Sequence, residues 1–395
     1  MRRSALWFTI GLSLLNPVTI HTAGSTRTTP FSPEAFSRYG TDFWASGGSG
    51  LASFGAPSLI NPGAMDFRSL TLNLEGTSRF ETQLLADINY DGQQIIPSLA
   101  SVGFALGATQ VSAGYARTYD SRINFSLLLL TPDNPAGTGQ TSDFDERFRI
   151  HTFFGSVSRS VSDRLSIGLT GGLNHLTFTE DISSEHAEGS GAGVQLIAGS
   201  LYSISEEVHL GLTVGYGSRI SFQQSYSSGG LRALPVDSSR TVSVPVSIEF
   251  SQQPPWNIAL GASWAVSTIV SLTSSAEYQH WSHVSDDWSN IIQFHVGAAI
   301  TPVDYFTLRA GFFTQTSPRD KTVSDNFSED FLTVGFRWSA TNQLTFSGNL
   351  VTGFRTGNAY DPFTGIHDNH FKQSSISLGI GYAPAKDDGQ PGNLP

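Results

Sequence analysis

Apolar and polar residues alternate one by one along many short stretches of this chain. In residues 165–173, Leu165, Ile167 and Leu169 are separated by Ser166 and Gly168. A period of two is that of a β-strand with one apolar face. The second face is small and polar, which suits the lumen of a membrane barrel better than the packed core of a sandwich. The same pattern recurs at residues 208–216, 292–300, 332–338 and 376–382.

The composition argues against a soluble domain and against a helical membrane protein. Charged residues make up 14% of the 395 residues, against about 25% in a soluble domain, so few charges are present to cover a soluble surface. The mean hydropathy is −0.10, and after the N-terminus no stretch approaches the roughly 18 apolar residues of a membrane helix. A barrel satisfies both observations because only every second strand residue faces lipid.

The connections between the alternating stretches are short and long in turn. This order is typical of antiparallel outer-membrane barrels, which have short periplasmic turns and long extracellular loops. We count about fourteen strands and therefore predict an all-β, transmembrane antiparallel β-barrel with both termini on the periplasmic side. Short turns are expected at residues 107–110, 162–163, 205–206, 267–268, 302–304 and 341–342, and long polar segments at 81–97, 130–146, 181–189, 223–255, 282–290, 315–326 and 357–371.

The N-terminus has the features of a secretory signal peptide. Arg2 and Arg3 precede the apolar run Ala5–Leu15, and the small residues Ala23 and Gly24 offer a cleavage site. A retained membrane anchor is disfavoured, because the apolar run is shorter than the roughly 20 residues that span a bilayer. We therefore predict a signal peptide over residues 1–24. The absence of cysteine excludes disulfides, thiolate metal sites and a lipoprotein anchor.

Residues 25–66 differ from the rest of the chain. They are rich in Gly, Ser, Ala and Pro and show little alternation, so they form either a flexible linker or a segment folded inside something larger. We assign residues 67–384 to the barrel. Residues 385–395 form a polar C-terminal tail, which we expect to be disordered.

No motif points to catalysis or to a cofactor. The known hydrolase, zinc-protease and nucleotide-binding patterns are absent. His367 and His370 flank Asp368 in a metal-like cluster, but its spacing matches no known ligand pattern well and a solvated polar turn explains it. The net charge of −11 carries no run of Lys or Arg, which argues against nucleic-acid binding. We expect a protein that is not an enzyme and holds no metal or cofactor.

Arginines are spread over different strands. A lumen-facing arginine could bind a substrate carboxylate through two hydrogen bonds. Pairing with Asp or Glu of neighbouring strands is the more common arrangement for charges at membrane depth, and we favour it. The residues concerned are Arg68, Arg79, Arg117, Arg122, Arg149, Arg219, Arg309 and Arg337.

Segments along nearly the whole chain resemble the FadL-type outer-membrane transporters of long-chain fatty acids and other hydrophobic compounds. The first, Gly47–Met65, resembles the N-terminal hatch of that family, whose Asn-Pro-Ala motif stands here as Asn61, Pro62 and Gly63. The others are Ser162–Phe178, Leu212–Phe222, Ala276–Val284 and Thr301–Pro318.

The resemblance implies a fourteen-stranded barrel whose lumen holds residues 25–66 as a hatch. It also implies a lateral gap, made by an inward kink in the third strand, here about residues 109–125. Gly114 could relax that strand because glycine marks bulges and close approaches. The position of the family's kink glycine falls near Asp120.

The resemblance further implies passive uptake of a hydrophobic small molecule, most simply a long-chain fatty acid, across the outer membrane of a Gram-negative bacterium. The ligand would leave sideways into the lipid. An extracellular apolar capture site is expected at Phe125, Leu127, Leu128, Leu129 and Leu130. The lipid-facing end of a strand explains this apolar run equally well. We expect a monomer whose partners are its ligand and the surrounding lipid.

Two other functions fit the same fold. A scaffold or adhesion barrel would transport nothing, and a porin for small polar solutes would have an open lumen without a hatch. An enzyme embedded in a barrel is the least supported, since no catalytic motif is present.

Overall fold

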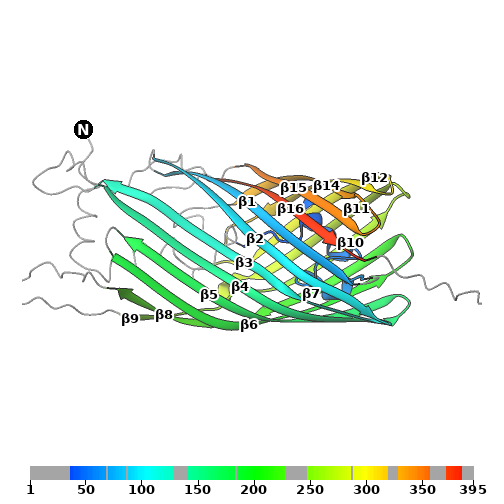
Figure 1. Ribbon diagram of the computed structural model, residues 1–395, viewed down its shortest axis with the longest axis horizontal. Coiled ribbons are helices and arrows are strands. Elements are labelled where there is room, and N and C mark those ends of the chain that lie inside the picture. The colour runs from blue at the N-terminus through cyan, green and yellow to red at the C-terminus, as the bar shows by residue number, and fades with distance from the viewer. Residues whose placement is uncertain are drawn as a thin grey trace, which may run out of the picture.

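The computed structural model describes residues 36–67, 70–85, 88–128, 141–182, 185–227, 247–285, 288–318, 328–355 and 371–384. These residues form one antiparallel sheet that closes on itself into a tall barrel (Figure 1). The predicted signal peptide and C-terminal tail lie outside the described residues. Within those residues, no helix has the length and apolar character needed to cross a bilayer.

The strands follow one another around the wall. Their bounds are β1 Thr71–Leu85, β2 Ile88–Leu106, β3 Thr109–Leu128, β4 Thr141–Ser162, β5 Leu165–Ile182, β6 Glu185–Ser203, β7 Val208–Gly217, β8 Ile220–Ser227, β9 Ser247–Gln252, β10 Trp256–Ala265, β11 Val270–His280, β12 Ile291–Val303, β13 Phe306–Gln315, β14 Glu329–Ser339, β15 Leu344–Arg355 and β16 Phe371–Tyr382.

Two of the wall's strands are each interrupted once. Both β7 and β8 pair with β6, β7 pairs with β10, and β8 pairs with β9. Thus β7 with β8 is one strand of the wall, and β9 with β10 is another. Pairing of β1 with β16 and of β5 with β6 completes the circle. The wall has fourteen strands, which confirms the predicted fold class.

All six predicted short turns lie between consecutive strands at one end of the barrel, which we call the periplasmic end. Three of the predicted long segments are wrong: residues 81–97 and 181–189 consist almost wholly of strand, and residues 223–255 contain β9. In residues 81–97, β1 continues to Leu85 and β2 begins at Ile88; in residues 181–189, β5 continues to Ile182 and β6 begins at Glu185. The polar sequence of these segments does not end the strands, because the hydrogen bonds that pair strands are made by backbone groups.

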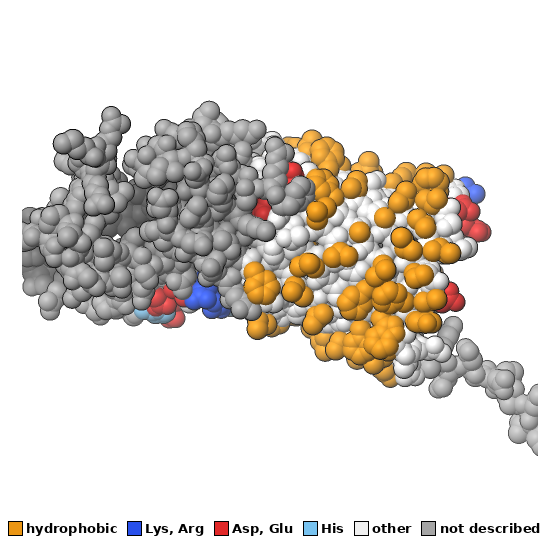
Figure 2. Space-filling model, turned by 90° about the horizontal axis from the view of Figure 1, so that it is seen from above, with side chains coloured by type: hydrophobic (Ala, Val, Ile, Leu, Met, Phe, Trp, Pro, Cys, Tyr) orange, Lys and Arg blue, Asp and Glu red, His pale blue; other side chains and the backbone are white. Residues whose placement is uncertain are grey.

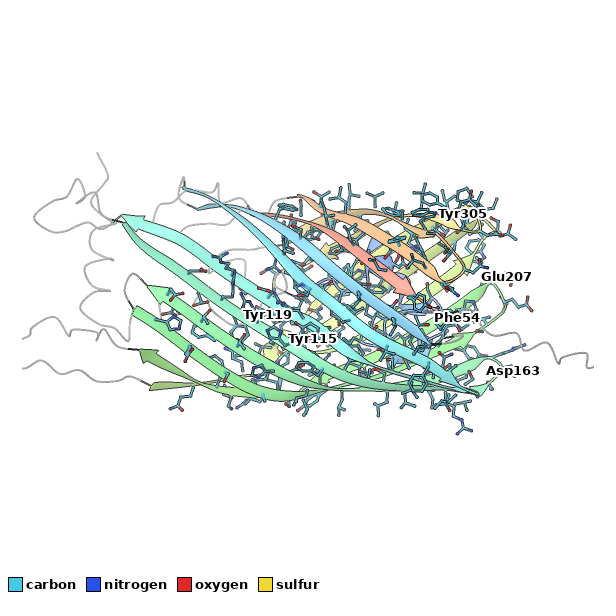
Figure 3. The ribbon with its side chains drawn as sticks, in the orientation of Figure 1. Phe54, Tyr115, Tyr119, Asp163, Glu207 and Tyr305 are labelled. Carbon is cyan, nitrogen blue, oxygen red and sulfur yellow. The ribbon has the colours of Figure 1, made fainter. Side chains whose placement is uncertain are left out.

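The alternation separates an outer apolar face from an inner polar one. Leu212 on β7 is 44% exposed and points outward, whereas its neighbour Thr213 is 5% exposed and points inward. Figure 2 shows the resulting apolar surface, in orange, on the face of the barrel in view. Tyr305 lies at the periplasmic end (Figure 3), where amphipathic aromatic rings settle at the membrane surface. The outer face is therefore suited to lipid.

Residues 36–67 lie inside the barrel, and we call them the interior segment. The segment contains the helix α3 (Thr41–Ala45) and the 3-10 turns η2 (Gly50–Ala52) and η3 (Pro62–Ala64). α3 contacts β13 to β16, η2 contacts β7, β10 and β11, and η3 contacts β4 to β6. A further 3-10 turn, η4 (Trp281–His283), follows β11. Residues 25–35 of the predicted hatch lie outside the described part, and its role as a plug stays a prediction.

The outer apolar band predicts that a charged substitution on the outer face costs more stability near the bilayer midplane than at the membrane surface. We expect Leu212→Arg, about four residues from the turn, to lower the free energy of unfolding by about 2–4 kcal/mol, because arginine near the bilayer midplane loses its hydration. Val208→Arg at the periplasmic end of the same strand should cost about 0–1 kcal/mol. Denaturant unfolding in phosphatidylcholine vesicles, followed by tryptophan fluorescence, measures both. Equal costs would contradict this placement of the band.

Candidate functional site in the barrel interior

The start of α3 is held by a carboxylate of the wall. The side chain of Glu75 on β1 accepts hydrogen bonds from the backbone N–H groups of Gly40 (2.7 Å) and Thr41 (3.0 Å). Free N–H groups at a helix start attract a negative charge. In addition, Asn349 of β15 donates to the Thr41 carbonyl at 2.8 Å. The wall thus fixes both the position and the direction of this short helix.

Ion pairs tie the same helix to two further strands. Asp42 lies 3.1 Å from a guanidinium nitrogen of Arg309 and 3.4 Å from one of Arg337. Both arginines were among those whose partner the sequence left open. They pair with an acidic residue, as favoured above, but that residue belongs to the interior segment and not to a neighbouring strand.

The Asn61, Pro62 and Gly63 motif forms η3 and joins the segment to the wall. The fully buried amide of Asn61 accepts from the Gly63 N–H at 3.0 Å and donates to the carbonyls of Leu51 (2.8 Å) and Ser200 (3.1 Å). A Cβ on Gly63 would stand 2.5 Å from the Ser200 Cα. Glycine at this position, where the motif of the FadL-type family has alanine, therefore fits the close approach of the β6 backbone.

Glycines of the wall make room for the interior segment. An added Cβ at Gly297 or Gly311 would collide with the backbone of residues 46–47, and one at Gly199 would collide with Asn61 and Pro62. The sequence analysis missed these residues. Their signal is a glycine at an inward position of an otherwise regular strand, which indicates a close backbone approach.

A cavity of about 250 Å³ lies on the extracellular side of the interior segment. The segment contributes apolar side chains to it, including Phe36, Trp44 and Leu59, whereas β10 to β13 contribute polar side chains such as Gln293. A second cavity, of about 1270 Å³, is lined by residues of the segment and of the periplasmic turns, among them Tyr305. The interior segment lies between the two.

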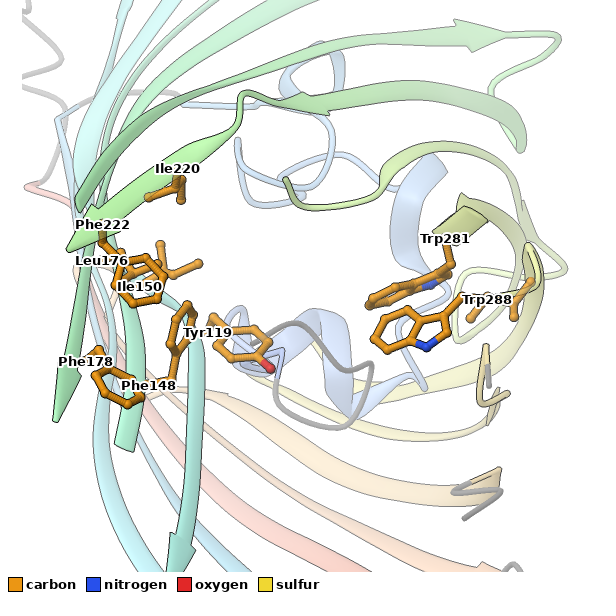
Figure 4. Close-up of a cluster of buried hydrophobic side chains, with 10 residues drawn as sticks. Tyr119, Phe148, Ile150, Leu176, Phe178, Ile220, Phe222, Trp281 and Trp288 are labelled. Carbon is orange, nitrogen blue, oxygen red and sulfur yellow. The ribbon is translucent and has the colours of Figure 1, made fainter. Parts of the chain in front are cut away.

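Buried rings form an apolar cluster in the extracellular half of the lumen. Phe36 joins its two sides, because its ring lies 5.2 Å from that of Tyr119 and 6.2 Å from that of Trp281. Figure 4 shows the two tryptophans facing the Phe148 side of the cluster across the interior. Its members are Tyr119, Phe148, Ile150, Leu176, Phe178, Ile220, Phe222, Trp281, Trp288 and Ile291. Since Ile150 and Phe36 also line the smaller cavity, apolar surface continues into it.

Arg38 is the arginine among the residues that line the smaller cavity. Its guanidinium lies 4.4 Å from the ring centre of Phe331 and 5.3 Å from that of Phe313, and it donates to the Gln315 side chain at 3.2 Å. Next to it, burial and then the charge of Glu277 raise the pKa of the Tyr39 hydroxyl, which stays protonated. The cavity thus offers one guanidinium beside aromatic surface. The sequence analysis did not single out Arg38.

The wall is not paired throughout its height. Within the residues that the structure describes, β2 pairs with β3 only from Leu106 with Thr109 up to Leu99 with Ala116. Beyond that point β2 continues against β1, and β3 continues against β4 to Leu128. Each strand has a bulge where the pairing ends, with Ser98 as the extra residue of β2 and Thr118 that of β3. Figure 1 shows β2 and β3 parting toward the extracellular end.

Other groups bind the exposed edge of β3. The N–H of Ser37 donates to the Thr118 carbonyl at 3.1 Å, and Arg79 of β1 donates to the Asp120 carbonyl. Tyr119 forms a single bridge with Phe36. Unpaired backbone groups are costly where no water reaches them, so these contacts stabilise the break. Thr118 also lines the smaller cavity, which therefore reaches the wall at this position.

The candidate gate and capture residues lie at different places on β3. Gly114 lies in the paired part, where an added Cβ would meet Ala100 and the Phe154 ring, and Asp120 lies two residues beyond the bulge. Phe125, Leu127 and Leu128 belong to β3 and not to a loop; their side chains, and Leu129 and Leu130, lie outside the described part. The roles of all these residues stay predictions.

The metal-like cluster at His367 and His370 also lies outside the described residues. Within the described ranges, no group of three or more His, Cys, Asp or Glu side chains could hold a metal ion.

Solved structures share this architecture. A Pseudomonas aeruginosa FadL homologue matches with a TM-score of 0.63 at 14% identity, over 88% of this chain and 99% of its own. The toluene transporters TbuX of Ralstonia pickettii (TM-score 0.66, 14% identity, 88% and 98% covered) and TodX of Pseudomonas putida (0.64, 13%, 88% and 98%) match similarly.

The sequence itself matches no protein-family model and no curated protein. The structural likeness therefore defines a fold. With its closed wall and apolar outer band, the chain has the β-barrel fold of the FadL-type structures.

The close fit at η3 predicts that alanine is not tolerated at residue 63. Because its Cβ would meet the Ser200 backbone, Gly63→Ala should loosen the interior segment. In a chain without native cysteine, a cysteine placed at buried Ala52 reports this as faster maleimide labelling. Gly50→Ala is the matched control, since its Cβ has no neighbour closer than 3.4 Å. Slow labelling in both variants would contradict the fit.

Proposed function

We propose that this barrel takes up hydrophobic compounds passively across the outer membrane, with the interior segment as the hatch. The observation that carries the proposal is the smaller cavity, which lies beneath the apolar cluster and reaches the wall at Thr118, where the pairing of β2 with β3 ends. An apolar molecule gains nothing by entering water. A route from the cluster through the cavity and sideways into lipid keeps it in apolar surroundings.

The proposed hatch separates the two cavities of the lumen. It is hydrogen-bonded to wall strands on several sides, for example from Thr333 to the Ala45 carbonyl at 3.0 Å and from Thr170 to the Ser58 carbonyl at 2.8 Å. A segment held this way blocks a straight aqueous path. This supports lateral exit over the open pore of a porin.

Long-chain fatty acids are the first candidate ligands. Their carboxylate needs a cationic partner away from water, and Arg38 offers one beside the aromatic rings of the cavity. In this arrangement the chain of the acid lies along the apolar cluster toward Tyr119 and Trp281. A scaffold barrel needs neither the cavity nor the guanidinium.

Small aromatic hydrocarbons are the second candidate, favoured by the size of the cavity. Its volume of about 250 Å³ is small for a long chain but ample for one ring, since an apolar cavity of about 150 Å³ takes up benzene. Two of the solved structures with this fold are toluene transporters.

Removal of the bulge on β3 tests the lateral route. Deletion of Thr118 brings β3 into the regular register that pairs with β2, so the edge should close. We expect the uptake of labelled oleate and toluene by cells to fall to the level of cells without the protein. Deletion of Val161, which removes a bulge near a periplasmic turn of β4, is the control and should leave uptake unchanged.

Two outcomes would contradict the proposed route. One is full uptake by the Thr118 deletion although heat-modifiability on gels shows a folded barrel. The other is a steady ion conductance of the unmodified protein in planar bilayers, which would favour a porin.

Replacement of Arg38 separates the two ligand classes. Because a charge-assisted hydrogen bond contributes about 1.5–3 kcal/mol, Arg38→Gln should weaken oleate binding about tenfold to a hundredfold and leave toluene binding unchanged. Quenching of tryptophan fluorescence in detergent measures both affinities. Equal losses for the two ligands would show that Arg38 acts through packing alone, and an unchanged oleate affinity would remove fatty acids as the preferred ligand.

A further inference from the structure

Four arginines gather on the outer face of β3 and β4. Buried Phe148 and Ile150 of β4 point into the apolar cluster of the lumen, so the residues between and beside them point outward. Arg147 and Arg149 therefore face away from the lumen, and the register pairs them with Arg122 and Asp120 of β3. Arg117, opposite His151, completes the group. We call Arg117, Arg122, Arg147 and Arg149 the outer basic cluster.

The cluster stands at the extracellular border of the apolar band. On the same face of β4, Arg159 lies next to the periplasmic turn, with exposed Val157 and Phe153 between it and the cluster. Arg159 lies ten positions after Arg149 in the chain. At about 3.3 Å per residue and a strand tilt of about 40°, they span about 25 Å along the membrane normal, which is the height of a barrel's apolar band. The two arginines thus lie at the two membrane surfaces.

Aromatic and imidazole rings lie directly below the cluster. Tyr115 and Phe153 are cross-strand partners with ring centres 5.5 Å apart, and the Tyr115 hydroxyl is 2.8 Å from the His151 ring nitrogen. Such rings settle at the headgroup level of a bilayer. Figure 2 shows basic side chains, in blue, beside the extracellular edge of the apolar band.

Protein carboxylates neutralise only part of this charge. Arg122 binds Asp145 through two hydrogen bonds of 2.9 and 2.7 Å. Asp120 lies 2.9 Å from Arg117 but 3.9 Å from Arg149. In the part of the chain that the structure describes, Arg147 has no acidic partner within 4 Å, and the Nε atoms of Arg117, Arg147 and Arg149 have no hydrogen-bond partner. Among the described side chains, four guanidinium groups thus share two carboxylates.

Guanidinium groups crowded at a lipid surface need an anion. Their planar N–H groups match the oxygens of a phosphate, which they bind through two hydrogen bonds at a time. Basic residues at this depth recognise anionic lipid headgroups. The cluster faces lipid and not the lumen, so the anion it meets is carried by a lipid.

We propose that the outer basic cluster is a binding site for the phosphate group of an anionic lipid in the outer leaflet, with Arg147 and Arg149 as its main ligands. The acyl chains of this lipid pack below, on Phe153, Val157 and Leu173 of the apolar band. The bound lipid stands beside β3, the strand whose other side is the unpaired edge. It therefore forms part of the surroundings of the break without taking part in the transport route.

Native mass spectrometry of the full chain tests this site. The protein in detergent is incubated with phosphatidic acid, with diacylglycerol of the same acyl chains, or with inorganic phosphate. We expect it to retain phosphatidic acid and not diacylglycerol. Because each arginine at the membrane surface contributes about a kilocalorie per mole to anionic lipid binding, Arg147→Gln with Arg149→Gln should weaken retention about thirtyfold.

The control has the same change of charge at the other membrane surface. Arg159→Gln with Arg164→Gln alters one arginine at the periplasmic end of β4 and one in the turn that follows it, and should keep retention within about twofold of the unmodified protein. Equal losses in both double variants, or equal retention of diacylglycerol, would overturn the proposal. Displacement of the lipid by equimolar inorganic phosphate would also overturn it, in favour of a site for free anions.

Measuring the uptake of oleate and toluene in the same variants tests the transport function independently of lipid binding. Retention of phosphatidic acid that depends on Arg147 and Arg149 supports the lipid site whether or not the barrel takes up oleate or toluene.

Discussion

The structure depends on one requirement, that backbone N–H and C=O groups surrounded by lipid have hydrogen-bond partners within the protein. Closure of the sheet through β1 with β16 meets it for most of the wall. Where the pairing stops, other groups substitute. Ser37 and Arg79 bind the free edge of β3, and the Gln253 side chain donates to the Gly217 carbonyl, 3.1 Å away, where β7 and β9 end. The breaks in the wall are therefore as specifically built as the paired strands.

Much of the wall could be predicted because its signals are local. The alternation of Leu212 with Thr213 reports the two faces without knowledge of any neighbour, and turn residues such as Ser162 and Asp163 mark strand ends directly. The break between β2 and β3 has no such signal. A bulge at Thr118 depends on the register of two strands against a third, so the sequence analysis pointed to Gly114 and Asp120 on either side of it.

The interior was harder to predict for the same reason. Arg38 and Glu75 act through residues far away in the chain, the former through Gln315 and the latter through Gly40. The resemblance of residues 47–65 to a hatch indicated where a packed segment lies, but not that Asp42 would neutralise two arginines of the wall. Asp42 of the interior segment pairs with Arg309 and Arg337 of the wall, whereas the surplus of positive charge in the outer basic cluster lies on the outer face.

The hydrogen bonds of the interior segment also bear on the order in which the barrel assembles. They reach wall residues from both halves of the chain, namely Thr170, Ser200, Ser263, Thr333 and Asn349. Because the segment is joined to early and late strands alike, its hydrogen bonds are complete only when both halves of the wall are in place. The first described residues of the chain therefore reach their final contacts only after strands near its end have formed.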